Sequence, residues 1–276
     1  MAARSLLLEG RGKKVFEDGK PDQVLLEFKE YIIDSKSNKR KTIKGKGSIN
    51  ASVTANLFEY LNSYNVSNHF VAKENENEIR VKKLEIIPIE ILIRNFSHGK
   101  FCKKYGIREG EELKSPVMEC HLKNEKLKKP LMCESLIYAL DLAKKEEVMV
   151  INQLATKTNA ILKDYFARRG LKLIEIRLEF GRLNGSIILA DEISLDTCSL
   201  LDTQTNEKYY QEDMVLSDLP AGWYDIQIDI DSYEGRIQLE IFPGQVTYFT
   251  FQGEEGFTFD LPPSPGIEAL TPTAED

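Results

Sequence analysis

The chain has 276 residues and a formal net charge of −7, which is long enough for two domains or one large one. Residues 217–276 hold 12 acidic residues and one basic residue, so they carry −11 and residues 1–216 carry +4. This mildly basic body suits anionic small molecules rather than nucleic acid, which requires concentrated basic stripes. No apolar stretch approaches the ~20 residues of a membrane span, and the four cysteines form no CxxC pair. We therefore expect a soluble, cytoplasmic protein that has no membrane partner, no zinc site and no disulfides.

The N-terminal segment predicts a strand, a glycine-rich turn and a second strand, over residues 6–9, 10–14 and 15–16. Glycines let backbone N–H groups approach a phosphate, and a lysine can neutralise its charge. An ordinary hairpin turn has the same pattern, so the loop by itself indicates no function. A third strand is expected over residues 24–28.

A helix is expected over residues 51–64, because apolar residues recur there at helical spacing. Its apolar face consists of Val53, Leu57, Phe58 and Leu61. The strand expected next, over residues 66–71, carries His69. A lone histidine beside an apolar strand is more often structural than catalytic, and we interpret His69 in that way.

The middle of the chain predicts strands followed by helices. Residues 78–95 form an extended apolar run, which we expect Pro88 to break into two strands. Two helices should follow, over residues 135–142 and 146–169, and Gly170 should end the second.

The most regular pattern covers residues 173–202. Two strands, over residues 173–180 and 186–190, flank a turn that ends in Asn-Gly, which predicts a β-hairpin. Such a hairpin would bring Glu179 close to Asp191, which directly follows the second strand. Two carboxylates on a rigid element suit Mg²⁺, which proteins usually bind through one or two carboxylates and substrate phosphates. A solvated charged face on an edge hairpin would give the same pattern.

The hairpin residues match a known signature. Leu-Glu-Phe-Gly at 178–181 is followed by Asp-Glu-Ile-Ser-x-Asp-Thr-Cys at 191–198, and this ordered string resembles the signature of the SAICAR synthetase family. Members of that family are ATP-dependent ligases of purine biosynthesis. They join L-aspartate to the carboxylate of carboxyaminoimidazole ribonucleotide, called the ribotide below. The resemblance covers residues 6 to about 216 and implies ATP and Mg²⁺ as cofactors.

The resemblance also implies an α+β fold with antiparallel sheets in two lobes and an ATP cleft between them. We expect an ATP-binding lobe over residues 1–90 and a mixed lobe for substrate and metal over residues 91–216. The rest departs from the family. A short β-rich acidic extension over residues 217–260 is predicted from alternating strands and a Pro-Gly turn, and a disordered tail from its Pro, Thr and acid content over residues 261–276. The sequence leaves a homo-oligomer open.

Individual roles come from the resemblance alone. The implied metal ligands are Glu179 and Asp191, and the implied catalytic cations are Lys123 and Arg177. The residues implied for the nucleotide are Arg11, Gly12, Lys13, Lys82, Leu84 and Glu85. The residues implied for the ribotide are Glu90, Arg94, Lys100 and Ser199.

Several positions depart from the family pattern: Tyr31, Lys36, Lys100, Lys129 and Ser199. Ser199 stands where the family has an arginine for the ribotide phosphate, and Lys100 stands where it has a serine. Lys100 could supply the lost charge, although a lysine is a point charge without the fork of arginine, or both changes are incidental. The alternative function is therefore a divergent relative, either a ligase for another carboxylate or a non-catalytic nucleotide-binding protein.

Overall fold

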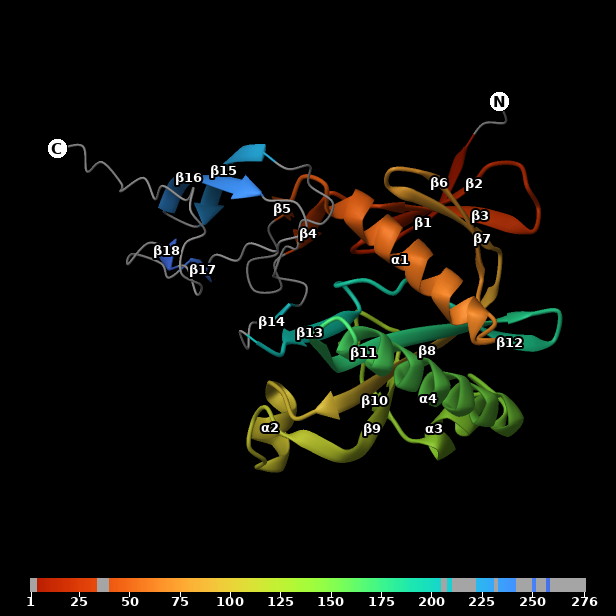
Figure 1. Ribbon diagram of the computed structural model, residues 1–276. Coiled ribbons are helices and arrows are strands. Elements are labelled where there is room, and N and C mark those ends of the chain that lie inside the picture. Colours follow the sequence, from red (N-terminus) through yellow and green to blue (C-terminus); the bar gives the residue numbers. More distant parts are fainter. Residues whose placement is uncertain are drawn as a thin grey trace. The chain divides into compact units, whose positions relative to one another are not determined.

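Five antiparallel strands form the N-terminal sheet, in the order β1-β2-β3-β7-β6 (Figure 1). They are β1 Ser5–Glu9, β2 Lys13–Glu17, β3 Gln23–Phe28, β6 Phe70–Asn75 and β7 Glu78–Lys82. Strand β4 (Tyr31–Ile33) pairs with β5 (Arg40–Thr42) in a separate ribbon. The three strands expected in the first 28 residues are therefore present as β1, β2 and β3, and the expected glycine-rich turn joins the first two.

Helix α1 (Lys46–Ser63) packs against β3, β6 and β7. Three residues of its predicted apolar face are buried, whereas Val53 is half-buried. The helix begins at Lys46, before the expected start, because its first turn packs closely on the end of β3. A Cβ on Gly47 would lie 2.7 Å from the carbonyl oxygen of Phe28, so only glycine fits there.

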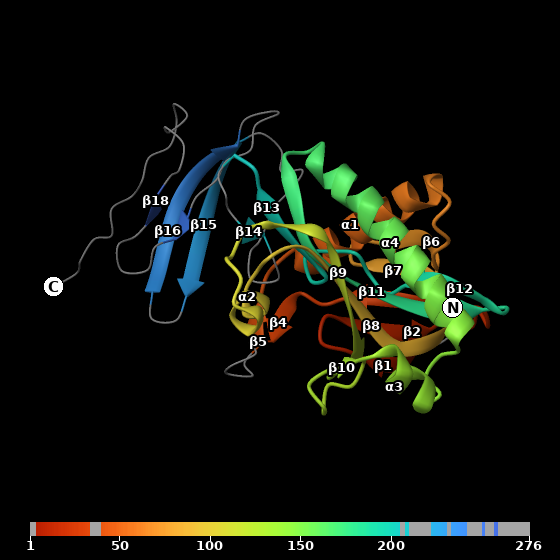
Figure 2. The ribbon, with the colours of Figure 1, turned by 90° about the horizontal axis from the view of Figure 1, so that it is seen from below.

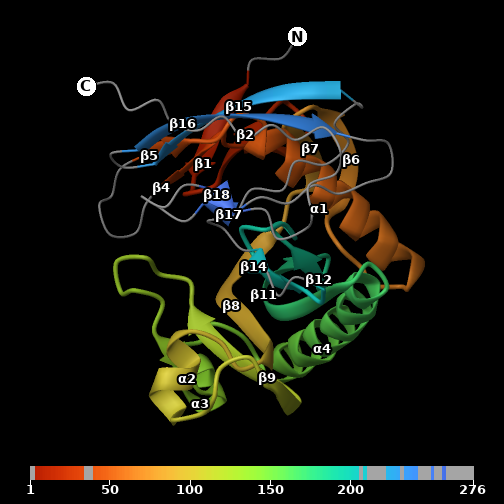
Figure 3. The same ribbon diagram turned by 60° about the vertical axis from the view of Figure 1, so that its left-hand side comes forward.

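The second sheet has seven antiparallel strands in the order β10-β9-β8-β11-β13-β14, with β12 paired to β11. They are β8 Glu85–Phe96, β9 Glu112–Leu122, β10 Leu131–Met132, β11 Leu171–Leu183, β12 Ser186–Ala190, β13 Cys198–Asp202 and β14 Lys208–Tyr209. Helix α4 (Lys145–Ala167) lies along β8, β11 and β12 (Figure 2). Helices α2 (Lys100–Tyr105) and α3 (Glu134–Ala139) lie with β9 on the side away from the N-terminal sheet (Figure 3).

The two faces of this sheet differ in polarity. Strands β8 and β11 are paired along most of their length, and side chains alternate between the faces of each strand. One face contributes apolar residues to the core: Ile89, Ile91, Ile93, Ile176, Leu178 and Phe180. The other carries the charged residues Glu90, Arg94, Glu175, Arg177 and Glu179. The sheet therefore presents a charged wall on the face opposite its core.

The predicted hairpin is confirmed as β11 and β12, although β11 runs on to Leu183. Its turn residues Asn184 and Gly185 have φ of 50° and 80°, the left-handed backbone that Asn-Gly favours in two-residue hairpins. The helices expected over residues 135–142 and 146–169 are present as α3 and α4, and Gly170 follows α4 with φ 73°.

The break expected at Pro88 is wrong. Strand β8 runs through Pro88, and the interruption lies between β7 and β8 instead. Proline is tolerated because the register between β8 and β11 shifts between Glu179 and Gly181, so no ladder N–H is required at this point. Its carbonyl still accepts a hydrogen bond from the N–H of Lys123 at 2.9 Å. Strand β9 and helix α2 were not foreseen from the sequence.

The structure describes residues 4–33, 40–204, 208–209, 222–230, 233–241, 250–251 and 257–258. The chain divides into two units, residues 1–215 and 216–276, and all elements so far belong to the first. In the second, β15 (Gly222–Ile230) pairs with β16 (Tyr233–Ile241), and β17 (Thr250–Phe251) with β18 (Phe257–Thr258). The expected Pro-Gly turn, the expected disordered tail and the loop with Lys36 lie outside the described residues. Within them, no helix has the length and apolarity to cross a membrane.

An ion pair fastens α4 to the second sheet and makes stability depend on pH. The carboxylate of Glu147 accepts bonds from Arg182 at 2.6 and 2.9 Å, and this guanidinium lowers the Glu147 pKa from 4.5 to about 2. A carboxyl whose pKa falls on folding stabilises the fold above its unfolded pKa, and that contribution is lost as pH falls toward the folded pKa.

We expect Glu147→Gln to lower the free energy of unfolding by about 1–2 kcal/mol at pH 7, measured by urea denaturation. The substitution removes the negative charge from a half-buried ion pair with Arg182. The difference from the parent should shrink as pH falls from about 4.5 toward 2. Asp164→Asn, which removes an exposed pair with Arg168, is the control and should leave stability nearly unchanged, because water screens that pair. A Glu147→Gln penalty that stays constant down to low pH would contradict this role.

Candidate active site

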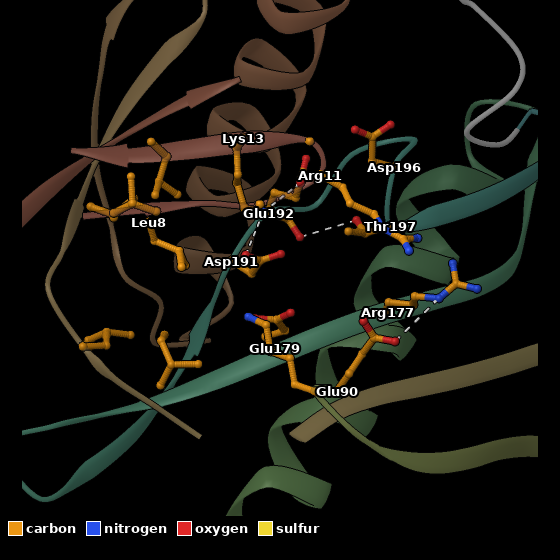
Figure 4. Close-up of a pocket in the computed structure, with 18 of the residues that line it drawn as sticks. Leu8, Arg11, Lys13, Glu90, Arg177, Glu179, Asp191, Glu192, Asp196 and Thr197 are labelled. Atoms are coloured by element: carbon orange, nitrogen blue, oxygen red, sulfur yellow. Dashed lines mark hydrogen bonds and ion pairs between the residues drawn. The ribbon is translucent and has the colours of Figure 1, made fainter. Parts of the chain in front are cut away.

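A cavity of about 860 Å³ opens between the two sheets of the first unit. The glycine-rich loop between β1 and β2 lines one side of it. Strands β3 and β7 with the β7–β8 connection line a second side, and β8, β11 and the segment after β12 line a third. Residues more than 150 positions apart in sequence, such as Lys13 and Asp191, thus face the same space (Figure 4).

One half of the cavity is apolar. Its lining side chains are Leu7, Leu8, Val15, Val24, Leu26, Val81, Leu84 and Ile86. Leu84 is seated directly on Gly181, since a Cβ at position 181 would lie 2.8 Å from the Leu84 Cβ and 3.2 Å from the Glu85 carbonyl oxygen. The glycine of Leu-Glu-Phe-Gly is therefore required by packing, because it lets the β7–β8 connection approach β11.

The other half is charged, and it contains a cluster of three carboxylates and two lysines. Register places Glu179 opposite Ala190, so Glu179 lies beside Asp191 and Glu192 at the end of β12. The Nζ of Lys13 lies 2.7 Å from Asp191 Oδ1 and 2.8 Å from Glu192 Oε1 (Figure 4). Lys123 donates to Glu179 from the loop after β9. Each of these carboxylates thus has an ammonium partner that also lines the cavity.

Burial and mutual charge set the ionisation of this cluster. Burial, with the charge of Asp191 nearby, raises the Glu179 pKa to about 7. Burial opposes ionisation of Asp191 too, but Lys13 and Lys123 hold its pKa below the ordinary value. The Glu192 pKa is raised, again because burial outweighs the attraction of Lys13. Three neighbouring acids with divergent pKa values are typical of a functional site.

The backbone of Asp191 is held in an unusual conformation. Its φ is 66°, in the left-handed region that a residue with a Cβ seldom adopts. The Nε2 of His69 lies 2.9 Å from the Asp191 carbonyl oxygen and donates to it, while the His69 N–H donates to Leu189. Burial lowers the His69 pKa to about 4, so the ring is neutral near pH 7. His69 therefore acts as a structural clamp on the hairpin end.

A fourth acid, Asp196, has a buried side chain that supports the glycine loop. The Oδ2 of Asp196 accepts hydrogen bonds from Lys46 at 2.5 Å and from Asn50 at 3.0 Å. A Cβ on Gly12 would lie 3.2 Å from that oxygen, so glycine lets the loop approach the carboxylate. Sequence reasoning assigned no role to Asp196, Lys46 or Glu192. The available signal was their place inside matched strings, Gly45-Lys46-Gly47 and residues 191–198.

The charged wall of the second sheet continues beyond the cluster that contains Lys13 and Lys123. Lys129 binds Glu90 at 2.6 Å, and Arg177 lies 3.8 Å from the same carboxylate. Arg177 also donates to Glu175 at 3.1 Å. Farther along, Arg94 pairs with Glu175 and, at 3.2 Å, with Glu119. Acids and bases alternate along this wall.

Most residues singled out from the sequence line the cavity: Arg11, Gly12, Lys13, Lys82, Leu84, Glu90, Lys123, Arg177, Glu179 and Asp191. Glu85 does not line it, because its exposed carboxylate points to Arg182 at 2.7 Å. Arg94 and Ser199 also lie outside the lining, with Ser199 paired opposite Glu175 in β13. Lys100 begins α2, and its side chain is outside the described part of the structure.

Comparison with known proteins gives consistent results. The family model described as SAICAR synthetase matches residues 6–220. The phosphoribosylaminoimidazole-succinocarboxamide synthase of Persephonella marina is 38% identical over 238 residues, covering 86% of this chain and all of that protein. The protein of the same name from Chloroherpeton thalassium is 43% identical over 208 residues, covering 75% and 88%.

Solved structures agree with these sequences. The enzyme of that name from Ehrlichia chaffeensis superposes with a TM-score of 0.71 at 36% identity, covering 74% of this chain and 88% of that one. A SAICAR synthetase in complex with ADP gives 0.70 at 35% identity, covering 74% and 87%. The α+β fold, the cleft and these matches define an ATP-dependent C–N ligase. The chain belongs to the SAICAR synthetase family.

The contact between Leu84 and Gly181 gives a test of the cleft. We expect Gly181→Ala to push Leu84 into the apolar half and to weaken ADP binding about ten- to hundredfold, the effect of overpacking by 1–3 kcal/mol. Calorimetric titration with ADP would measure the affinity, and thermal unfolding would show whether the variant is folded. Unchanged ADP affinity in a folded variant would contradict the expectation that Leu84 contacts the nucleotide.

Proposed function

We propose that this chain joins L-aspartate to the carboxylate of the ribotide, with ATP and Mg²⁺, through an acyl phosphate. The observation that carries the proposal is one cavity with an apolar half beside the lysines Lys13 and Lys123 and the acids Glu179 and Asp191. The names of the relatives, which the chain matches over most of their length, support the aspartate–ribotide ligation. The ADP complex of a relative supports the use of ATP.

The apolar half suits a purine base, since Leu84 and Ile86 offer aliphatic contact. The glycine loop carries Arg11 and Lys13 toward the charged half, where phosphates would follow the base. Arg11 is exposed and pairs with Glu125, so it can turn to a ligand at small cost. Lys13 is deeper in the cavity and pairs with two acids.

The donor set fits a hard divalent cation. Glu179 and Asp191 are carboxylates on one hairpin and both face the cavity. The described residues contain no group of three or more His, Cys, Asp or Glu placed to hold a metal. A pair of carboxylates suits an ion that takes one or two protein carboxylates and completes its shell with phosphate oxygens, as Mg²⁺ does. When bound, Mg²⁺ would neutralise phosphate charge during transfer.

The chemistry follows from the difficulty of condensing a carboxylate with an amine in water. A carboxylate oxygen of the ribotide attacks the γ-phosphorus of ATP, and the bond to the ADP oxygen breaks. The amine nitrogen of aspartate then attacks the acyl carbon, phosphate leaves with the bonding electrons, and the nitrogen loses a proton. Phosphoryl transfer requires mainly positioning and charge neutralisation, which Lys13, Lys123 and Arg177 would supply.

The ribotide and aspartate would lie on the charged wall, near Glu90, Arg177 and Lys129. The same wall favours one alternative function, a ligase that acts on a different carboxylate substrate. Arg94 is already paired with two acids, and position 199 holds a buried serine in place of the arginine of the family pattern. The described part of the wall therefore offers the ribotide phosphate fewer unpaired cations than that pattern would.

A coupled ADP-release assay with ATP, Mg²⁺, the ribotide and L-aspartate tests the function. ADP release that requires both the ribotide and aspartate supports the proposal. Release with another carboxylate only, or ATP binding without release, supports the alternatives. Growth of a purine auxotroph that lacks its own synthetase, when supplied with this chain, would test the same activity in cells.

Lys13 and Lys14 make a matched pair for mutation, because they lie on opposite faces of β2. Lys13→Met should lower kcat/KM for ATP about a hundredfold, since it removes a buried cation aimed at the phosphates. Lys14→Met removes a half-buried partner of Glu27 outside the cavity and should leave kcat/KM within about twofold. Equal losses in both variants would show that the Lys13 effect is not specific to the cleft.

A further inference from the structure

The two lysines neutralise the carboxylates that would hold a metal ion. Lys13 contacts Asp191 and Glu192 at 2.7 and 2.8 Å, and Lys123 contacts Glu179. Each contact involves one oxygen of the carboxylate: Oδ1 of Asp191, Oε1 of Glu192 and Oε2 of Glu179. A metal ion and the lysines therefore compete for the negative charge of the same carboxylates.

The charge balance of the cluster gives a lone metal ion little attraction. The two ammonium groups offset most of the negative charge of the three carboxylates. A divalent ion that entered with both lysines in place would gain little attraction and would lie close to two like charges. It would also have to break ion pairs in which Asp191 and Glu179 are largely buried.

The lysines have another position available. Both line the cavity, and a lysine has a flexible stem with three donors that can be redirected without loss of charge. Nucleotide phosphates entering from the apolar half would attract both ammonium groups. Once the lysines move to the phosphates, the charges of Glu179 and Asp191 are no longer neutralised. A divalent cation could then bind between these carboxylates and the phosphates.

We propose that Lys13 and Lys123 keep Glu179 and Asp191 occupied until nucleotide phosphates draw the two ammonium groups away, so that metal and nucleotide bind with positive coupling. This inference rests on the proposed function for the identity of the nucleotide. By linkage, each ligand should raise the affinity for the other by the same factor. The free protein should bind a divalent cation weakly, and nucleotide should supply the missing attraction.

The test uses Mn²⁺ alone as the probe, with free Mn²⁺ followed by electron paramagnetic resonance in the absence of nucleotide. Lys123→Gln should bind Mn²⁺ about tenfold more tightly than the parent, because the competing charge is gone. The same variant should bind ADP in EDTA about tenfold more weakly, because a phosphate partner is gone. A lysine with a merely structural role would not give opposite signs for the two ligands.

Lys163→Gln is the matched control, since Lys163 pairs with Glu112 at 2.6 Å at the surface, outside the cavity. It should leave both affinities unchanged within about twofold. Lys13→Gln provides a second variant should Lys123→Gln unfold, with the same expected signs. Mn²⁺ affinity equal to or weaker than that of the parent in a folded variant would overturn the proposal. A parent chain that binds no ADP would instead overturn the proposed function, and the Mn²⁺ result would still decide whether the lysines compete.

Discussion

The contact between Lys13 and the acids Asp191 and Glu192 is the interaction on which the site depends. It joins the glycine loop of the N-terminal sheet to the hairpin of the second sheet. Burial penalises the lysine, yet the acids around it raise its pKa, so it remains charged between two charged partners. Such a contact stabilises the fold only while both sides are present, because either side alone would be a buried unpaired charge. The same constraint keeps the cleft polar at one end.

Backbone geometry places Asp191 for this contact. Asp191 has a left-handed backbone conformation and directly follows the β11–β12 hairpin, whose register is fixed by its two turn residues, Asn184 and Gly185. A neutral, buried His69 holds its carbonyl group, and the helix α1 residues Lys46 and Asn50 hold Asp196 five residues later. Elements from the N-terminal half of the chain thus position acids from the C-terminal half. A cleft of this kind can bind nucleotide only when both sheets are folded.

Two of the positions that depart from the family pattern lie at the second sheet: Lys129 pairs with Glu90 of its charged wall, and Ser199 lies in β13 opposite Glu175. Lys129 and Glu90 form a close pair, and Arg94 is paired with Glu119 and Glu175. The residues that we propose for nucleotide and metal, Lys13, Lys123, Glu179 and Asp191, form ion pairs with one another. Under this proposal, the preferred carboxylate substrate could change while the phosphate chemistry is kept.

The sequence by itself determined the hairpin, α4 and the first three strands, because turn chemistry and periodicity are local signals. An ordered motif also singled out Lys13, Glu179 and Asp191, which all line the cavity. Tertiary structure decided the rest. Pro88 lies within a strand because register shifts in a partner far along the chain, and Glu85 points to Arg182 away from the cavity. The pairing of each carboxylate with a particular lysine depends on contacts between residues about 56 to 179 positions apart, which no local pattern encodes.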